Sequence, residues 1–130
     1  MPGPSRWRWV SIALAAGSAY DAIFAVLMLA CAAPVARLFG LSLPADPVYF
    51  KLNAILLLIL ASLYAVAARE PERYRLIAPV SGAGRVAGFI FFVWAWRGGR
   101  PPAFLALGAG DVAIGLATLW VWRRASLLSS

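Results

Sequence analysis

Long apolar stretches alternate with short polar ones along the whole chain. Four of the apolar stretches have the length of about 20 residues that a helix needs to cross the hydrocarbon core of a bilayer. They run over about residues 9–31, 48–68, 76–96 and 102–122. The pattern therefore predicts an all-α, polytopic membrane protein in which residues 1–130 form a single domain, a bundle of four transmembrane helices.

The segments between these stretches contain the residues that end helices. Residues 44–47 and 98–102 combine proline with aspartate or glycine, so both segments are predicted to be loops. Between the first two spans, the apolar residues of segment 35–39 share one face of a helix, and Gly40 follows them. We therefore expect a short interfacial helix at residues 35–39, between the first and second spans.

The composition excludes a water-soluble domain. Hydrophobic residues make up 63% of the chain and charged residues only 13%. The charged share is far below the roughly 25% that is typical of soluble domains, so the chain cannot cover a soluble surface.

The positive charge of the chain gives an orientation. The 12 Lys and Arg residues outnumber the 5 Asp and Glu residues, and most of them flank the apolar stretches. A nucleic-acid site would instead need a clustered basic face. With the N-terminus inside, the cytoplasmic ends would collect seven arginines: Arg6, Arg8, Arg69, Arg73, Arg75, Arg123 and Arg124. Only Arg37, Arg97 and Arg100 would lie outside. The positive-inside rule thus predicts a multi-pass protein of the cell (inner) membrane with both termini in the cytoplasm.

Several kinds of chemistry are excluded by what the chain lacks. It contains no histidine and one cysteine, Cys31. An intrachain disulfide, a Cys/His metal site, a Cys–His nucleophile pair and a histidine-ligated haem are therefore impossible within this chain. We expect no enzymatic activity, no metal and no cofactor.

Three charged residues lie in the middle of predicted spans. Asp21 is twelve residues after Trp9, and Arg85 and Asp111 are each eleven residues before a tryptophan that closes the span. All three therefore share one depth in the bilayer. A charge at this depth costs roughly 2.5 to 3.5 kcal/mol on insertion scales, so we expect Arg85 to lie between the two carboxylates and to pair with both.

Two interpretations of these three residues stay open. The ion pairs could only fix how the helices pack, since buried pairs can specify one arrangement. Alternatively, they could form part of a site for a ligand, an ion or a proton, because ionisable residues inside a membrane commonly mark functional sites.

A second set of polar residues begins the second span. Lys51 lies there with Tyr49 and Asn53 beside it, and these residues could line a cavity that opens outward toward the charged centre. A plain anchor is the preferred interpretation for Lys51, because its ammonium group can reach the interface.

Small residues accompany the central charges. Gly84 and Gly88 flank Arg85 with the spacing that allows two membrane helices to approach closely. We expect them to mark helix packing within the bundle, with formation of a homo-oligomer as the alternative.

The layout of the chain resembles the small four-helix DoxX-like membrane proteins. The similarity consists of Pro34 with Arg37-Leu38-Phe39-Gly40-Leu41, then Tyr49-Phe50-Lys51-Leu52-Asn53-Ala54, and finally Gly84-Arg85. Such relatives include the small subunit of a thiosulfate:quinone oxidoreductase. The resemblance implies an accessory or ligand-handling membrane protein and supplies no catalytic residues for this chain.

These observations lead to one expected function and one alternative. We expect a non-enzymatic membrane protein that either binds a small or lipid-like molecule or serves as an accessory subunit of a membrane complex. The alternative is a membrane-anchor subunit of a quinone-linked redox enzyme. In each case the partners are the lipid bilayer and a ligand or other subunits, not nucleic acid.

Overall fold

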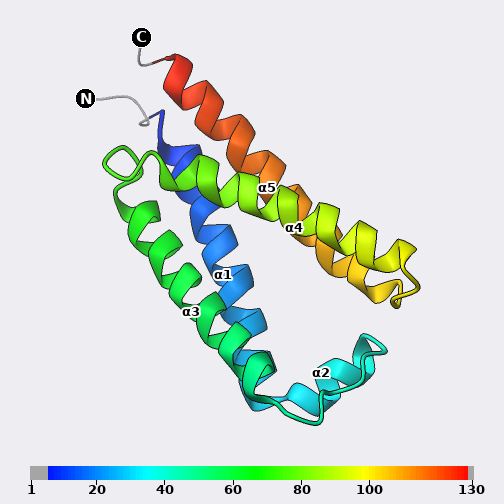
Figure 1. Cartoon of the computed structure of the whole chain (residues 1–130). Coiled ribbons are helices and arrows are strands. Elements are labelled where there is room, and N and C mark those ends of the chain that lie inside the picture. The colour runs from blue at the N-terminus through cyan, green and yellow to red at the C-terminus, as the bar shows by residue number, and fades with distance from the viewer. Residues whose placement is uncertain (1–5, 129–130) are drawn as a thin grey trace.

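The computed structural model describes residues 6–128, which form five helices (Figure 1). Four are long: α1 (Arg8–Ala30), α3 (Val48–Arg69), α4 (Ile77–Arg97) and α5 (Ala103–Leu127). The fifth, α2 (Ala32–Leu38), is short and lies between α1 and α3. The all-α prediction with a short helix after the first span is therefore confirmed.

The four long helices have the length and composition of membrane spans. They contain 21 to 25 residues, which at ~1.5 Å per residue corresponds to about 32 to 38 Å. This exceeds the roughly 30 Å of a hydrocarbon core. The largest difference from the predicted bounds is at the end of α5, which continues to Leu127. Arginine is a good helix former, so the charges at residues 123 and 124 end the apolar stretch without ending the helix.

The chain bends between α1 and α2. Cys31 has φ −133° and ψ 42°, which interrupts the helix, and Gly40 (φ 64°) lies just beyond the end of α2. The short helix begins at Ala32, three residues before the predicted start at Val35. Pro34 is compatible with this start because the first amide groups of a helix have no partner within it.

The four long helices pack as two pairs (Figure 1). Helix α1 packs along α3, α4 packs along α5, and the pairs meet mainly where α1 contacts α5. The start of α1 and the end of α5 lie at the same end of the molecule, whereas the pairs diverge toward the end that carries α2. The first residues of α1 and the last residues of α5 thus lie at one end, and which side of the membrane that end faces stays a prediction.

Hydroxyl groups join α1 to α3 at a regular spacing. Ser18 donates a hydrogen bond to the carbonyl oxygen of Ala61 over 2.6 Å, and Ser11 donates to that of Ala68. The two donors and the two acceptors are each seven residues apart on antiparallel helices. Each serine therefore meets α3 at the same relative position, and such bonds support helix association in membranes.

The buried apolar residues form two separate clusters. The larger one lies near the termini and contains Trp7, Val10, Leu14, Tyr64, Ala67, Ala78 and Ala125. The smaller one lies toward α2 and contains Ala25, Met28 and Ala54. Between these clusters lies a layer that includes buried Asp21 and Arg85.

Close contact between α4 and α5 depends on Gly82 and Gly115. A Cβ atom on Gly82 would lie 2.6 Å from Cγ of Leu119 and 2.9 Å from the carbonyl oxygen of Gly115. The expectation that Gly84 and Gly88 mark packing within the bundle is wrong, because a Cβ on either residue would have nothing within 4 Å. Gly84 is rotated by about 200° around the helix from Gly82, so it points away from α5.

Candidate functional site

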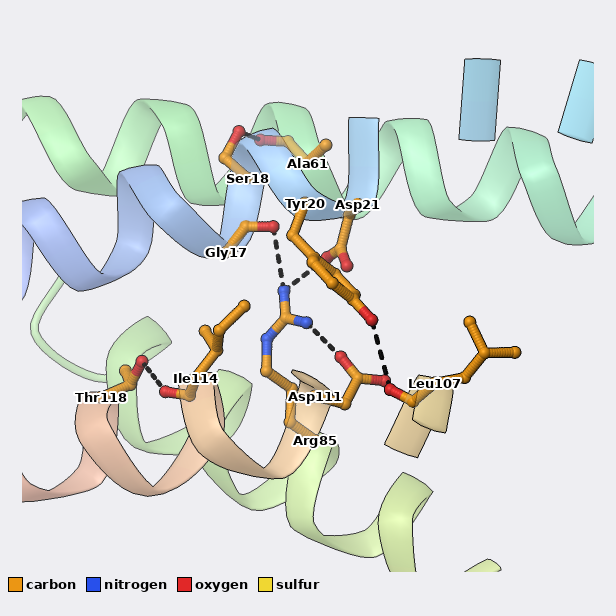
Figure 2. A network of polar contacts seen from close by, with 10 residues as sticks. All are labelled: Gly17, Ser18, Tyr20, Asp21, Ala61, Arg85, Leu107, Asp111, Ile114 and Thr118. Atoms are coloured by element: carbon orange, nitrogen blue, oxygen red, sulfur yellow. Dashed lines mark hydrogen bonds and ion pairs between the residues drawn. The ribbon is translucent and has the colours of Figure 1, made fainter. Parts of the chain in front are cut away.

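Arg85 joins three helices in the middle of the bundle (Figure 2). Its Nη2 atom lies 2.7 Å from Oδ2 of Asp21 on α1, and its Nη1 atom lies 2.5 Å from Oδ1 of Asp111 on α5. The prediction that Arg85 contacts both carboxylates is therefore confirmed. A planar guanidinium suits this role because its two terminal nitrogens point to different acceptors.

The backbone of α1 provides a third acceptor. Nη2 of Arg85 donates to the carbonyl oxygen of Gly17 over 3.1 Å. A Cβ atom on Gly17 would lie 3.0 Å from the same nitrogen. The absence of a side chain at residue 17 therefore lets the guanidinium approach the backbone of α1.

Two tyrosine rings enclose the guanidinium. Its Cζ atom lies 5.9 Å from the ring centre of Tyr20 and 5.6 Å from that of Tyr64. These distances are within the range of about 6 Å for cation–π attraction. The sequence analysis missed both tyrosines, although each is a polar aromatic residue well inside a span, and that position was the available signal.

The cluster of Asp21, Arg85 and Asp111 is unevenly buried. The side chains of Arg85 and Asp21 are 6% and 8% exposed, whereas that of Asp111 is 24% exposed. The Nε atom of Arg85 is buried without a hydrogen-bond partner in the part of the chain that the structure describes. The cluster therefore combines a nearly fully buried ion pair, Arg85–Asp21, with a partly exposed one, Arg85–Asp111, and with both acids ionised it carries a charge of −1.

The polar residues at the start of α3 do not join this cluster. Tyr49 is 79% exposed, and Lys51 is also exposed. The prediction that these two residues line a cavity together with Asn53 is therefore wrong. Lys51 is rotated by about 200° around the helix from Asn53, and Tyr49 lies in the first turn. Asn53 alone lines a cleft, the one described next.

A cleft of about 400 Å³ lies between the two helix pairs at the end that carries α2. Its walls are mainly aromatic and apolar: Phe24 and Met28 from α1, Phe50 from α3, Phe92 from α4, and Phe104 and Leu107 from α5. Ser42, Asn53 and Arg100 add polar groups. Phe92 and Phe104 contact each other across α4 and α5, with ring centres 5.7 Å apart.

Tyr20 connects the cluster to the cleft. Its ring lies near the guanidinium of Arg85, and its hydroxyl donates to the carbonyl oxygen of Leu107 over 3.2 Å (Figure 2). Its ring also stacks on that of Phe24, with centres 6.5 Å apart. Leu107 and Phe24 both line the cleft, so one side chain contacts the central ion pairs and two residues of the cleft wall.

The described residues offer little for metal or thiol chemistry. Within residues 6–128, no group of three His, Cys, Asp or Glu side chains could hold a metal ion. Cys31 is an exposed free thiol at the bend between α1 and α2.

Comparisons of this chain with protein-family models, curated proteins and solved structures found no match. The resemblance to DoxX-like proteins therefore stays a prediction from the sequence.

Proposed function

We propose that this is a non-enzymatic integral membrane protein that binds a small, lipid-like molecule in the cleft between its two helix pairs. The single observation that carries the proposal is the cleft itself, which has a volume of about 400 Å³ and mainly apolar walls that include several phenylalanines. Ligand pockets commonly occupy roughly 300 to 1,000 Å³ and combine apolar walls with a few polar groups.

The lining of the cleft supports an apolar ligand that also carries a polar group. Phe24, Phe92 and Phe104 supply apolar faces, whereas Asn53 and Arg100 supply hydrogen-bond donors. These lining residues belong to both helix pairs. A molecule bound in the cleft would therefore contact both pairs at once.

The ion-pair cluster has a structural role in this proposal. Arg85 links α4 to α1 through Asp21 and to α5 through Asp111. The cluster thereby joins the pairs at mid-depth, while the cleft separates them at the α2 end. Tyr20 contacts Leu107 and Phe24 in the cleft wall. The distance between the helix pairs that the cluster sets would therefore also position this wall.

The test is to identify what co-purifies with the protein and whether a filled cleft excludes it. The whole chain is purified in a mild detergent, and bound small molecules are extracted and identified by mass spectrometry. In the variant Leu107→Trp a larger side chain occupies the cleft. Leu116→Trp is the matched control, since Leu116 is on the same helix and 55% exposed.

We expect the wild-type protein and Leu116→Trp to carry the same molecule and Leu107→Trp to lose it. Retention of that molecule by Leu107→Trp would contradict the proposal. Stoichiometric co-purification with another membrane protein, with no bound small molecule, would instead indicate the accessory-subunit function.

A further inference from the structure

A second concave surface lies at the opposite end of the molecule, where α1 begins and α5 ends. This groove has a volume of about 960 Å³ and is well separated from the cleft at the α2 end. Six of its lining residues form the terminal groove site: Arg6, Arg8, Trp9, Trp120, Arg124 and Leu128. Nothing in the proposed function uses this groove.

The charged lining of the groove is entirely positive within the described residues 6–128. Arg6 spans its edge, since Nη1 donates to the carbonyl oxygen of Leu128 over 2.9 Å and Nη2 lies 3.6 Å from Glu72. Arg8 and Arg124 form no ion pair with any described residue, and both are exposed. The groove therefore holds two guanidinium groups whose charge is not compensated within the described chain.

The position of Arg124 is fixed by an aromatic neighbour. Its Cζ atom lies 4.6 Å from the ring centre of Trp120, which is a close cation–π contact. This stacking holds the guanidinium beside the groove without occupying its hydrogen-bond donors, so the donors stay available to an anion.

The remaining lining is apolar and lies near the ends of two helices that are long and apolar enough to span a membrane. Trp9 is 65% exposed and Trp120 is 59% exposed, and both are near the ends of spans on the two sides of the groove. Indole rings favour the headgroup region of a bilayer. Arginines beside exposed apolar surface at this depth match a molecule with an anionic head and an apolar tail.

We infer that the terminal groove site binds one anionic phospholipid. The guanidinium groups of Arg8 and Arg124 receive the phosphate, and Trp9 and Trp120 contact the first part of the acyl chains. Basic pockets between membrane helices are a recurring form of site for anionic headgroups. A zwitterionic phospholipid binds less tightly there because its ammonium group opposes the positive lining.

The test measures the retention of defined lipids by the whole protein. Protein in detergent is mixed with phosphatidylglycerol or phosphatidylcholine, and bound lipid is counted by native mass spectrometry. The double variant Arg8→Gln/Arg124→Gln removes the two uncompensated charges. Arg75→Gln/Arg123→Gln is the matched control, because it removes the same charge from exposed arginines at the same end that do not line the groove.

We expect one phosphatidylglycerol to bind to the wild-type protein in preference to phosphatidylcholine. Since each arginine near an anionic surface is worth about a fivefold change in binding, the groove variant should bind roughly 25-fold more weakly and the control variant almost as tightly as wild type. Each single variant, Arg8→Gln or Arg124→Gln, should lose about fivefold, which tests the inference if the double variant does not fold.

Two results would overturn this inference. One is an equal loss of phosphatidylglycerol in the groove and control variants, which would show only a general attraction of charge. The other is displacement of the lipid by inorganic phosphate, which would show an anion site without a role for the acyl chains. Neither result bears on the cleft, which is tested with different residues.

Discussion

Removal of Arg85 should destabilise the protein strongly, because it leaves two carboxylates in the bundle without their common partner. Arg85→Leu deletes a buried guanidinium that contacts Asp21 at 2.7 Å, Asp111 at 2.5 Å and the Gly17 carbonyl at 3.1 Å. The loss of one partner from a buried ion pair costs about 3 to 5 kcal/mol, because the other charge is left without compensation. Asp21 is nearly fully buried and Asp111 is partly exposed, so most of this loss comes from Asp21.

The cost should largely disappear when the acids are neutralised. In Arg85→Leu/Asp21→Asn/Asp111→Asn no charge remains in the cluster, and we expect the triple variant to be about 2 to 3 kcal/mol more stable than Arg85→Leu alone. The assay is reversible unfolding in mixed micelles of increasing dodecyl sulfate content, followed by far-ultraviolet circular dichroism.

Arg97→Leu provides the matched control for this experiment. It makes the same substitution at the exposed end of the same helix, and its effect should stay within about 0.5 kcal/mol. The reasoning would be refuted if Arg85→Leu were as stable as Arg97→Leu. It would also be refuted if the triple variant were no more stable than Arg85→Leu.

Three further predictions follow from the same structure. Reporter fusions in the loop at residues 43–46 and at the C-terminus should report opposite sides of the membrane, with the C-terminus cytoplasmic; the same side for both would contradict the topology. Gly82→Ala should destabilise the protein by about 1 to 3 kcal/mol through its clash with α5, whereas Gly84→Ala, which meets no atom within 4 Å, should be neutral or stabilising in the same unfolding assay. Tyr20→Phe removes the hydrogen bond to Leu107 and should lower stability by about 0.6 kcal/mol, the average for such bonds between membrane helices; a loss as large as that of Arg85→Leu would contradict this role.

The sequence alone was sufficient to predict the helices and the common depth of the three central charged residues. Proline, glycine and arginine mark the span ends clearly, and counting from the tryptophans placed Asp21, Arg85 and Asp111 at one level. The energetic cost of an unpaired charge at this level then predicted the contacts that the structure contains.

The rotation of each helix could not be predicted in the same way. Hydropathy gives the depth of a residue, whereas the face on which it lies depends on which helices become neighbours. This is why Gly84, which was assigned to packing, and Tyr49, which was considered for a cavity, point outward. It is also why the positions of Tyr20 and Tyr64 beside the guanidinium needed the structure.

We expect the polar layer that separates the two apolar clusters to influence how the chain enters the membrane during synthesis. Helices α4 and α5 each carry one charge at mid-depth, and either helix alone would carry an insertion penalty of roughly 2.5 to 3.5 kcal/mol. The short connection at residues 98–102 keeps the two helices close together. Arg85 and Asp111 can therefore neutralise each other before α4 and α5 pack against α1. We therefore expect the translocation machinery to release α4 and α5 into the lipid as one hairpin, which then docks onto Asp21 of the helix synthesised first.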